Sequence, residues 1–264
     1  MGIHVPFLPP KTPRMKETLL DGRYELLDAL GSGGEARVFR AREKSTGREV
    51  AVRLALDPAT STAPGALPDF HAGWVRLLDA GIDPQQGPCQ IFELLEGQTL
   101  RQRVMSSGPM ERGPWRLFVG QSLAAVKALH DAGWAHGDLN GDNFVQTPGP
   151  RWKLLELPFL RFDPPPGRTA LFGSIHTLAP EQLNGAKADA GSDFYALGCL
   201  YYFAACGKFP HAAASSQEIA VNRLRFDPDP LTERAPGLPV SWSAWVMTLL
   251  SRNPQERVAT ALKD

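Results

Sequence analysis

The sequence is poor in cysteine and has no excess of either charge. Its 264 residues include three cysteines, Cys89, Cys199 and Cys206, without a C-x-x-C pair. That odd count and spacing suit neither a disulfide framework nor a zinc site, so free thiols in a reducing compartment are expected. Lysine plus arginine and aspartate plus glutamate each total 28. The balanced charge argues against a dedicated nucleic-acid binder, and no nucleic-acid partner is expected.

Long hydrophobic runs are also missing. The uncharged apolar stretch 194–207 has 14 residues, whereas a helix that crosses a bilayer needs about 20. This run therefore predicts a buried core helix. The N-terminus lacks the charged-then-apolar pattern of a signal peptide, and Pro6 stands where a myristoylation signal needs Ser or Thr. We predict no membrane segment in this chain and a cytoplasmic location.

Proline, in contrast, is abundant. It accounts for 24 of 264 residues, or about 9%, against an average of roughly 5%. The rest of the composition is that of a globular protein, with 43% hydrophobic and 21% charged residues. The length suits one large domain or two modest ones. The proline excess indicates a chain rich in turns and loops.

The pattern of apolar residues divides the chain into two parts. Residues 1–20 are aperiodic and predict an extended N-terminal arm. Residues 21–95 carry strand patterns, whereas 96–264 show mainly helical periodicity. Strands are expected at 24–27, 37–41, 49–54, 75–78, 89–92 and 152–155, and helices at 115–130, 193–207, 215–224 and 241–251. Residues 57–69, rich in Pro, Ala, Thr and Ser, predict a loop. The predicted fold class is α+β.

Two local patterns point to phosphate chemistry. The turn 31–34, Gly-Ser-Gly-Gly, lies between two expected strands, and glycines there let backbone N–H groups approach the phosphates of a nucleotide. Asp138 is followed five residues later by Asn143. This spacing places a base beside a metal ligand in phosphoryl transfer.

Several motifs in a fixed order resemble the eukaryotic-type (Hanks-type) Ser/Thr protein kinase family as it occurs in bacteria. The resemblance runs from Tyr24 to Arg257. Its motifs are the Gly-rich turn, Val50-Ala51-Val52-Arg53 in place of V-A-I-K, His136-Gly137-Asp138 in place of H-R-D, Ala179-Pro180-Glu181 as A-P-E, Asp193 of the core helix and Arg257. The resemblance implies a bilobal protein kinase-like domain with a small N-lobe at 21–95 and a larger C-lobe at 96–264. It also implies a buried pair between Glu181 and Arg257.

The resemblance further implies the residues of the site. Asp138 and Asn143 take the catalytic positions, with Asp138 accepting the hydroxyl proton. Asn143 and Glu156 take the positions of Mg²⁺ ligands. The positions that contact ATP are Gly31, Gly33, Val38, Ala51, Arg53, Glu93, Leu95 and Val145.

The sequence departs from the family pattern where the phosphates bind. Arg53 replaces the strand lysine, and a planar guanidinium does not substitute conservatively for a compact ammonium. Glu156 replaces the Asp of D-F-G, which moves the carboxylate by one methylene. Asn140 replaces the catalytic-loop lysine, and Gly137 replaces the arginine that grips a phosphorylated activation loop. Activation by loop phosphorylation is therefore not expected.

The regulatory helix αC of the family also has no counterpart in the sequence. Between Arg53 and Phe70 there is no Glu, and the interval contains the helix breakers Pro58, Pro64, Gly65 and Pro68. We predict that this helix is deleted or reduced to a loop. The glutamate that would hold the strand cation is then absent.

Three functions remain open at this stage. The main prediction is a pseudokinase, with impaired or no phosphotransfer, that acts as a regulator or scaffold for protein partners. The first alternative is a divergent but active Ser/Thr protein kinase that transfers the γ-phosphate of ATP to protein hydroxyls. The second is a small-molecule phosphotransferase. Residues 136–140 of this chain, His-Gly-Asp-Leu-Asn, resemble the catalytic loop of such enzymes. ATP and Mg²⁺ are the expected cofactors, with binding that is weak or lost.

Overall fold

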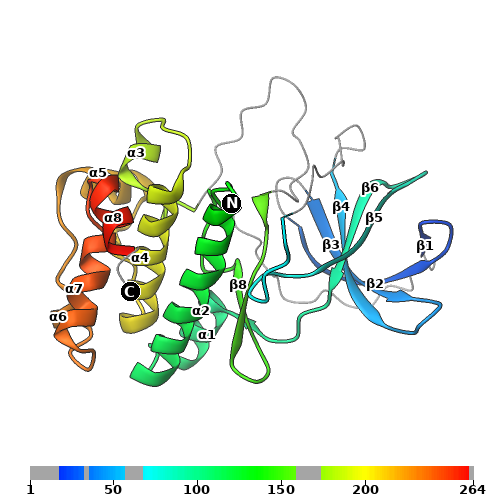
Figure 1. Cartoon of the computed structure of the whole chain (residues 1–264), viewed down its shortest axis with the longest axis horizontal. Coiled ribbons are helices and arrows are strands. Elements are labelled where there is room, and N and C mark those ends of the chain that lie inside the picture. Colours follow the sequence, from blue (N-terminus) through cyan, green and yellow to red (C-terminus); the bar gives the residue numbers. More distant parts are fainter. Residues whose placement is uncertain (1–17, 33–35, 57–67, 159–173, 262–264) are drawn as a thin grey trace. The chain divides into compact units, whose positions relative to one another are not determined.

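A computed structural model describes residues 18–32, 36–56, 68–158 and 174–261 (Figure 1). The chain divides into two compact units. The described residues up to Phe70 and Val75–Glu96 form the first, which we call the sheet unit. The described residues from Gly97 onward and His71–Trp74 form the second, the helical unit. The predicted boundary between 95 and 96 lies one residue before this division.

The sheet unit is built on one antiparallel sheet. Its strands occur in the spatial order β1-β2-β3-β4-β6-β5. Their bounds are β1 Thr18–Leu19, β2 Tyr24–Ser32, β3 Ala36–Glu43, β4 Glu49–Ala55, β5 Leu77–Asp83 and β6 Gly87–Glu93. Register shifts interrupt the pairing of β2 with β3 between Leu26 and Gly31. Such bulges bend a strand and re-aim the residues that follow, which here are those leading into the Gly-rich turn.

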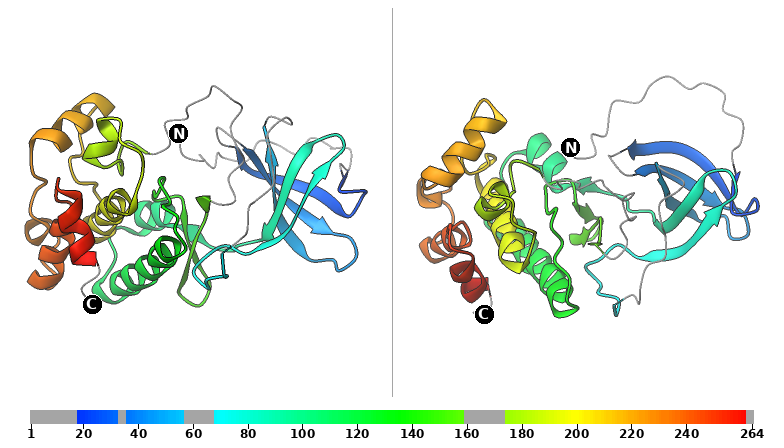
Figure 2. Two further views of the ribbon diagram at one scale, coloured as in Figure 1. Left: turned by 45° about the horizontal axis from the view of Figure 1, so that its top comes forward. Right: turned by 90° about the horizontal axis from the view of Figure 1, so that it is seen from above.

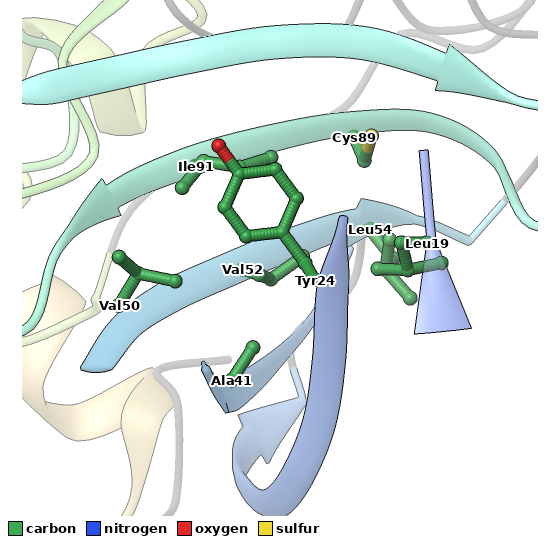
Figure 3. Close-up of a cluster of buried hydrophobic side chains, with 8 residues drawn as sticks. All are labelled: Leu19, Tyr24, Ala41, Val50, Val52, Leu54, Cys89 and Ile91. Carbon is green, nitrogen blue, oxygen red and sulfur yellow. The ribbon is translucent and has the colours of Figure 1, made fainter. Parts of the chain in front are cut away.

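Alternation along the strands separates two faces of this sheet. Val50, Val52 and Leu54 point to one face, because successive side chains of a strand alternate. They belong to a buried cluster with the Tyr24 ring at its centre (Figure 3). The cluster comprises Leu19, Tyr24, Ala41, Val50, Val52, Leu54, Cys89 and Ile91. The opposite face of β4 carries Ala51 and Arg53.

The helical unit combines a small sheet with helices. Its strands are β7 Gln98–Thr99, β8 Phe144–Thr147 and β9 Arg151–Leu154. The helices of the described residues are α1 Leu100–Ser107, α2 Arg112–Asp131, α3 Pro180–Leu183, α4 Ala190–Cys206, α5 Ser216–Arg225, α6 Leu231–Arg234, α7 Val240–Leu249 and α8 Pro254–Ala261. Helix α4 is buried along almost its whole length and lies between α2 on one side and α7 and α8 on the other (Figure 2). None of these helices is long and apolar enough to cross a membrane.

Most of the expected strands and helices are confirmed, with three differences. β5 begins two residues later than predicted and continues to Asp83, because its pairing with β6 extends over polar residues that hide the strand pattern. The last residues of the predicted arm form β1, since Leu19 is buried in the core. Four of the helices, α1, α3, α6 and α8, and the two strands β7 and β8 had no predicted counterpart. The predicted loop at 57–69 and the predicted loss of helix αC fall largely outside the described residues.

The predicted pair between Glu181 and Arg257 is confirmed, with Arg257 buried and the Glu181 side chain partly exposed. The two guanidinium Nη atoms of Arg257 donate to the two carboxylate oxygens of Glu181 at 2.7 and 2.9 Å. Arg257 is fully buried and also donates through Nε to the carbonyl of Ser251 at 2.6 Å. This bidentate contact connects α3 to α8, which are 76 residues apart in the sequence at these two positions.

We predict that Arg257→Met lowers the free energy of unfolding of the helical unit by about 3–5 kcal/mol, because it leaves a carboxylate and several carbonyls without their donor. Urea titration followed by tryptophan fluorescence measures this, since the tryptophans Trp74, Trp115, Trp134, Trp152, Trp242 and Trp245 all belong to the helical unit. The control is Arg234→Met, which breaks an exposed pair with Asp229 and should change stability by less than about 1 kcal/mol. Equal effects of the two variants would contradict the prediction.

Stability should also depend on pH through His211. Burial, together with Arg223 and Arg252, lowers the pKa of His211 to about 4. Between pH 6.5 and 4 the unfolded chain binds a proton at this residue and the folded chain does not, so stability falls as the pH decreases through this range. His211→Gln should flatten this part of the stability profile measured by urea titration. An unchanged slope in the variant would show that His211 does not carry the effect.

Candidate active site

A row of predicted nucleotide-site residues crosses the sheet unit. Gly31 of β2 lies opposite Val38 of β3, and Val38 lies opposite Arg53 of β4. Arg53 in turn lies opposite Gln90 of β6. Residues directly opposite one another in a sheet share a face, so this row shares the face of Ala51 rather than that of the buried cluster. The sheet thus places Gly31, Val38, Ala51 and Arg53 together.

Arg53 is held by its neighbour in the sheet. Its Nη1 donates to Oε1 of Gln90 at 3.1 Å, and both side chains are buried. This acceptor comes from β6 in direct register, so no helix is needed to bring it to Arg53. A side-chain amide acceptor is neutral, unlike the glutamate that the family pattern provides. The sequence pattern alone did not identify Gln90, because pairing between β4 and β6 is required to find it.

The remaining predicted site residues of the sheet unit, Glu93, Leu95 and Gly33, lie at or after the end of β6 or outside the described residues. Glu93 ends β6, where its N–H donates to the carbonyl of Arg76 at 3.0 Å and its carboxylate accepts from the N–H of Arg76 at 2.9 Å. Its N–H is therefore engaged within the sheet unit, and Leu95 follows two residues after the end of β6. Gly33 lies outside the described residues.

In the helical unit, a buried carboxylate anchors the loop that carries Asp138. Asp193 of α4 accepts hydrogen bonds from the backbone N–H groups of His136 and Gly137 at 2.7 and 2.8 Å. Nε2 of His130 lies 2.9 Å from the same carboxylate. The His136 ring in turn contacts the carbonyl of Leu155 at 2.9 Å. Loop 136–143 is thereby attached both to α4 and to the end of β9.

Asp138 and Asn143 are brought together by this loop. Nδ2 of Asn143 donates to the carbonyl of Asp138 at 2.8 Å. Nδ2 of Asn140 donates to Oδ1 of Asp138 at 3.1 Å and to its carbonyl at 3.2 Å. Asn140 therefore orients the Asp138 carboxylate but adds no positive charge where the family pattern has lysine. The loop therefore holds the Asp138 carboxylate beside the side-chain amides of Asn140 and Asn143.

The donor set of the predicted metal position is compatible with Mg²⁺. Because Asn143 uses its Nδ2 as a donor, its Oδ1 remains the oxygen for a cation. The backbone N–H of Leu155 donates to the carbonyl of Asn143 at 2.8 Å, which places Glu156 beside the same loop. Glu156 adopts a φ of 53°, a left-handed conformation that is strained for a residue with a side chain and is often found at functional sites. One carboxylate and one amide oxygen, completed by phosphates and water, suit Mg²⁺.

The backbone conformation and the close packing at position 137 favour glycine. Its φ is 74°, and an added Cβ would lie 2.9 Å from Cβ of Ala188. An arginine at this position would therefore need both a strained backbone and a displaced neighbour. The absence of that arginine is built into the local structure.

Sequence reasoning missed an ion pair that connects α1 to this loop. Nε of Arg101 donates to Oδ2 of Asp142 at 2.8 Å, and the hydroxyl of Thr99 donates to Oδ1 at 3.2 Å. The N–H of Arg101 also donates to the carbonyl of Gly141 at 3.0 Å. A capping box between Thr99 and Gln102 starts α1 at this point, and its T-x-x-Q pattern is the signal that could have located the helix.

Comparison with protein families matches residues 66–262 to the protein kinase domain. The chain belongs to the protein kinase family. The expected fold class, α+β and protein kinase-like, is thereby confirmed. Val145, which the family pattern assigns to the purine site, lies buried in β8, opposite Thr99 and Lys153.

Bacterial members of the protein kinase family are similar over most of the chain. The serine/threonine-protein kinase PknB of Mycobacterium leprae is 32% identical over 259 residues, which is 92% of this chain and 42% of that protein. PknB of Mycobacterium tuberculosis is 31% identical with the same coverage. The serine/threonine-protein kinase pkn2 of Myxococcus xanthus is 30% identical over 265 residues, or 32% of its length. The chain thus spans less than half the length of these relatives.

We predict that Gln90→Leu destabilises the sheet unit by about 1–3 kcal/mol, because it removes an acceptor from a buried guanidinium. Hydrogen exchange of the β4 and β6 amides, analysed by mass spectrometry, measures the effect in this unit alone. Gln86→Leu is the matched control, because Gln86 accepts from the exposed Arg37 and its loss should change stability by less than about 0.5 kcal/mol. Similar exchange in wild type and Gln90→Leu would contradict a structural role of this contact.

Proposed function

We propose that this protein kinase domain retains a purine-binding face but transfers phosphate poorly or not at all, and that it acts as a regulator or scaffold for protein partners. The observation that carries the proposal is Arg53, whose guanidinium is buried and donates to Gln90 within the sheet. A planar group held in this way is not a flexible ammonium that can follow a phosphate. Val38 and Ala51, on the same face, keep the apolar contacts that a purine needs.

The substitutions act together on the phosphates. Arg53 replaces the strand lysine, Asn140 the loop lysine and Glu156 the metal-binding aspartate. Phosphoryl transfer depends almost entirely on positioning and charge stabilisation. If each change removes about 2 kcal/mol of transition-state stabilisation, each slows the reaction about thirtyfold. Three such changes lower the rate by several orders of magnitude, although effects of this kind do not add strictly.

An active, divergent Ser/Thr protein kinase is the second candidate. It is supported by the arrangement of Asp138, Asn140 and Asn143, which retains a positioned base and an amide oxygen for a cation. The comparisons favour this candidate over the first, because the relatives are named serine/threonine-protein kinases. The pseudokinase candidate is supported by the substitutions at Arg53, Asn140 and Glu156 and by the hydrogen bond between Arg53 and Gln90. If the domain is active, ATP and protein hydroxyls are its substrates and Mg²⁺ is its cofactor.

The location that best suits the thiols is a reducing cytoplasm. The three cysteines are free, with Cys89 and Cys199 buried. Burial raises the pKa of both thiols to about 11, which suppresses the reactive thiolate.

A phosphotransfer assay with a matched inactive variant separates the two candidates. We expect the purified chain, incubated with γ-labelled ATP, Mg²⁺ and a general protein acceptor, to transfer no more label than Asp138→Ala. Asp138→Ala removes the proposed base and defines the background. Magnesium-dependent labelling by the wild type that Asp138→Ala abolishes would overturn the first candidate and establish the second. The same labelling with a small hydroxylated acceptor but no protein would point to a small-molecule phosphotransferase.

A further inference from the structure

An arginine of α5 lies inside a cage of backbone carbonyls. Nη1 of Arg223 donates to the carbonyls of Ile175 at 2.7 Å and of Leu178 at 2.5 Å, and Nη2 donates to that of His176 at 3.0 Å. Arg223 is 1% exposed. Three carbonyls from four consecutive residues thus converge on one guanidinium. This convergence fixes the path of the backbone there, because the donor fork of arginine is planar and rigid.

No carboxylate of the described residues forms an ion pair with Arg223. Its charge is instead met by the three carbonyl dipoles and by the ring of Tyr195, whose centroid lies 5.5 Å from the guanidinium carbon. A buried charge is tolerated only where polar groups surround it. The carbonyls of residues 175, 176 and 178 and the Arg223 guanidinium therefore stabilise each other.

The same segment also contacts the loop that carries Asp138. The N–H groups of Thr177 and Leu178 donate to the carbonyl of Ser174 at 2.9 and 3.1 Å, which closes a tight turn. Thr177 is buried and lines, together with Gly137 and Asp138, a cavity of about 10 Å³. This is about the space of one water molecule. The turn therefore packs closely against the residues that precede and include the proposed base.

A ring contact adds to the attachment. The imidazole of His176 stacks on Phe209 with the ring centroids 4.8 Å apart and an angle of 19° between the planes. Burial, with Arg101 and Arg223 nearby, lowers the pKa of His176. The ring is thus kept neutral, which suits its packing on an aromatic side chain.

We propose that Arg223 is a positioning residue that holds segment 174–178 against the catalytic loop without any phosphate on the chain. Gly137 leaves no cation on the catalytic-loop side at that position, and its glycine is fixed by φ and by Ala188. The cation that orders the segment comes instead from α5. The order of this segment is then a property of the folded chain, and it depends on α5 remaining in place.

Hydrogen exchange tests this role independently of catalysis. In Arg223→Met we expect the amides of Thr177 and Leu178 to exchange at least tenfold faster than in wild type, because the carbonyl cage loses its donors. Arg223→Lys retains the charge but cannot form the fork, and we expect an intermediate rate. Arg225→Met is the matched control, since Arg225 is exposed on the same helix, and it should leave the rates unchanged. Treatment of wild type with a phosphatase should also leave them unchanged.

Three outcomes would overturn the proposal. The first is unchanged exchange of segment 174–178 in Arg223→Met, and the second is faster exchange after phosphatase treatment of wild type. The third is an equal acceleration throughout α4 and α8 in Arg223→Lys, which would assign Arg223 to general stability. Tryptophan fluorescence identifies a variant that has not folded, and the lysine variant then decides. Because the readout is exchange and not phosphotransfer, a failure here is distinguishable from a failure of the proposed function.

Discussion

The site depends on the carboxylate of Asp193, which is buried in α4 and accepts from the backbone of the catalytic loop. It receives the N–H groups of His136 and Gly137, and the ring of His130 lies at hydrogen-bond distance. A buried carboxylate needs several donors to be stable, and consecutive backbone N–H groups supply them only in one loop conformation. The position of Asp138 relative to the helical unit follows from that requirement. Helix α4 can serve as this foundation because it is buried along its length.

In the proposed function, the retained and the altered parts of the phosphotransfer site lie in different units. Asp138 and Asn143, in the helical unit, keep the arrangement of a base beside an amide ligand. Arg53, in the sheet unit, replaces a mobile ammonium with a buried guanidinium that donates to Gln90. The same proposal assigns the purine to the sheet face that carries Val38 and Ala51. In the proposed function, recognition of a purine and stabilisation of its phosphates are therefore separable.

Sequence reasoning succeeded where the signal is local or repeated. Alternating apolar residues located β3, β4 and β6, helical periodicity located α2 and α4, and the ordered motifs predicted the Glu181–Arg257 pair. It failed where the structure depends on pairing between distant segments. Gln90 becomes the partner of Arg53 only through the register of β4 and β6, and Arg223 meets segment 174–178 only in the folded unit. Helices α1 and α8 carry capping patterns, at Thr99 and Asn253, that could have located them.

The central claim is that the purine face is retained while the phosphate end is altered, and calorimetric titration of the chain with adenosine and with ATP in the presence of Mg²⁺ tests it most directly. In a site that uses its cations and metal on the phosphates, ATP with Mg²⁺ binds far more tightly than the nucleoside. Here we predict affinities for adenosine and for ATP with Mg²⁺ within about tenfold of each other, a difference of about 1.4 kcal/mol. A preference for ATP with Mg²⁺ of a hundredfold or more would contradict this account.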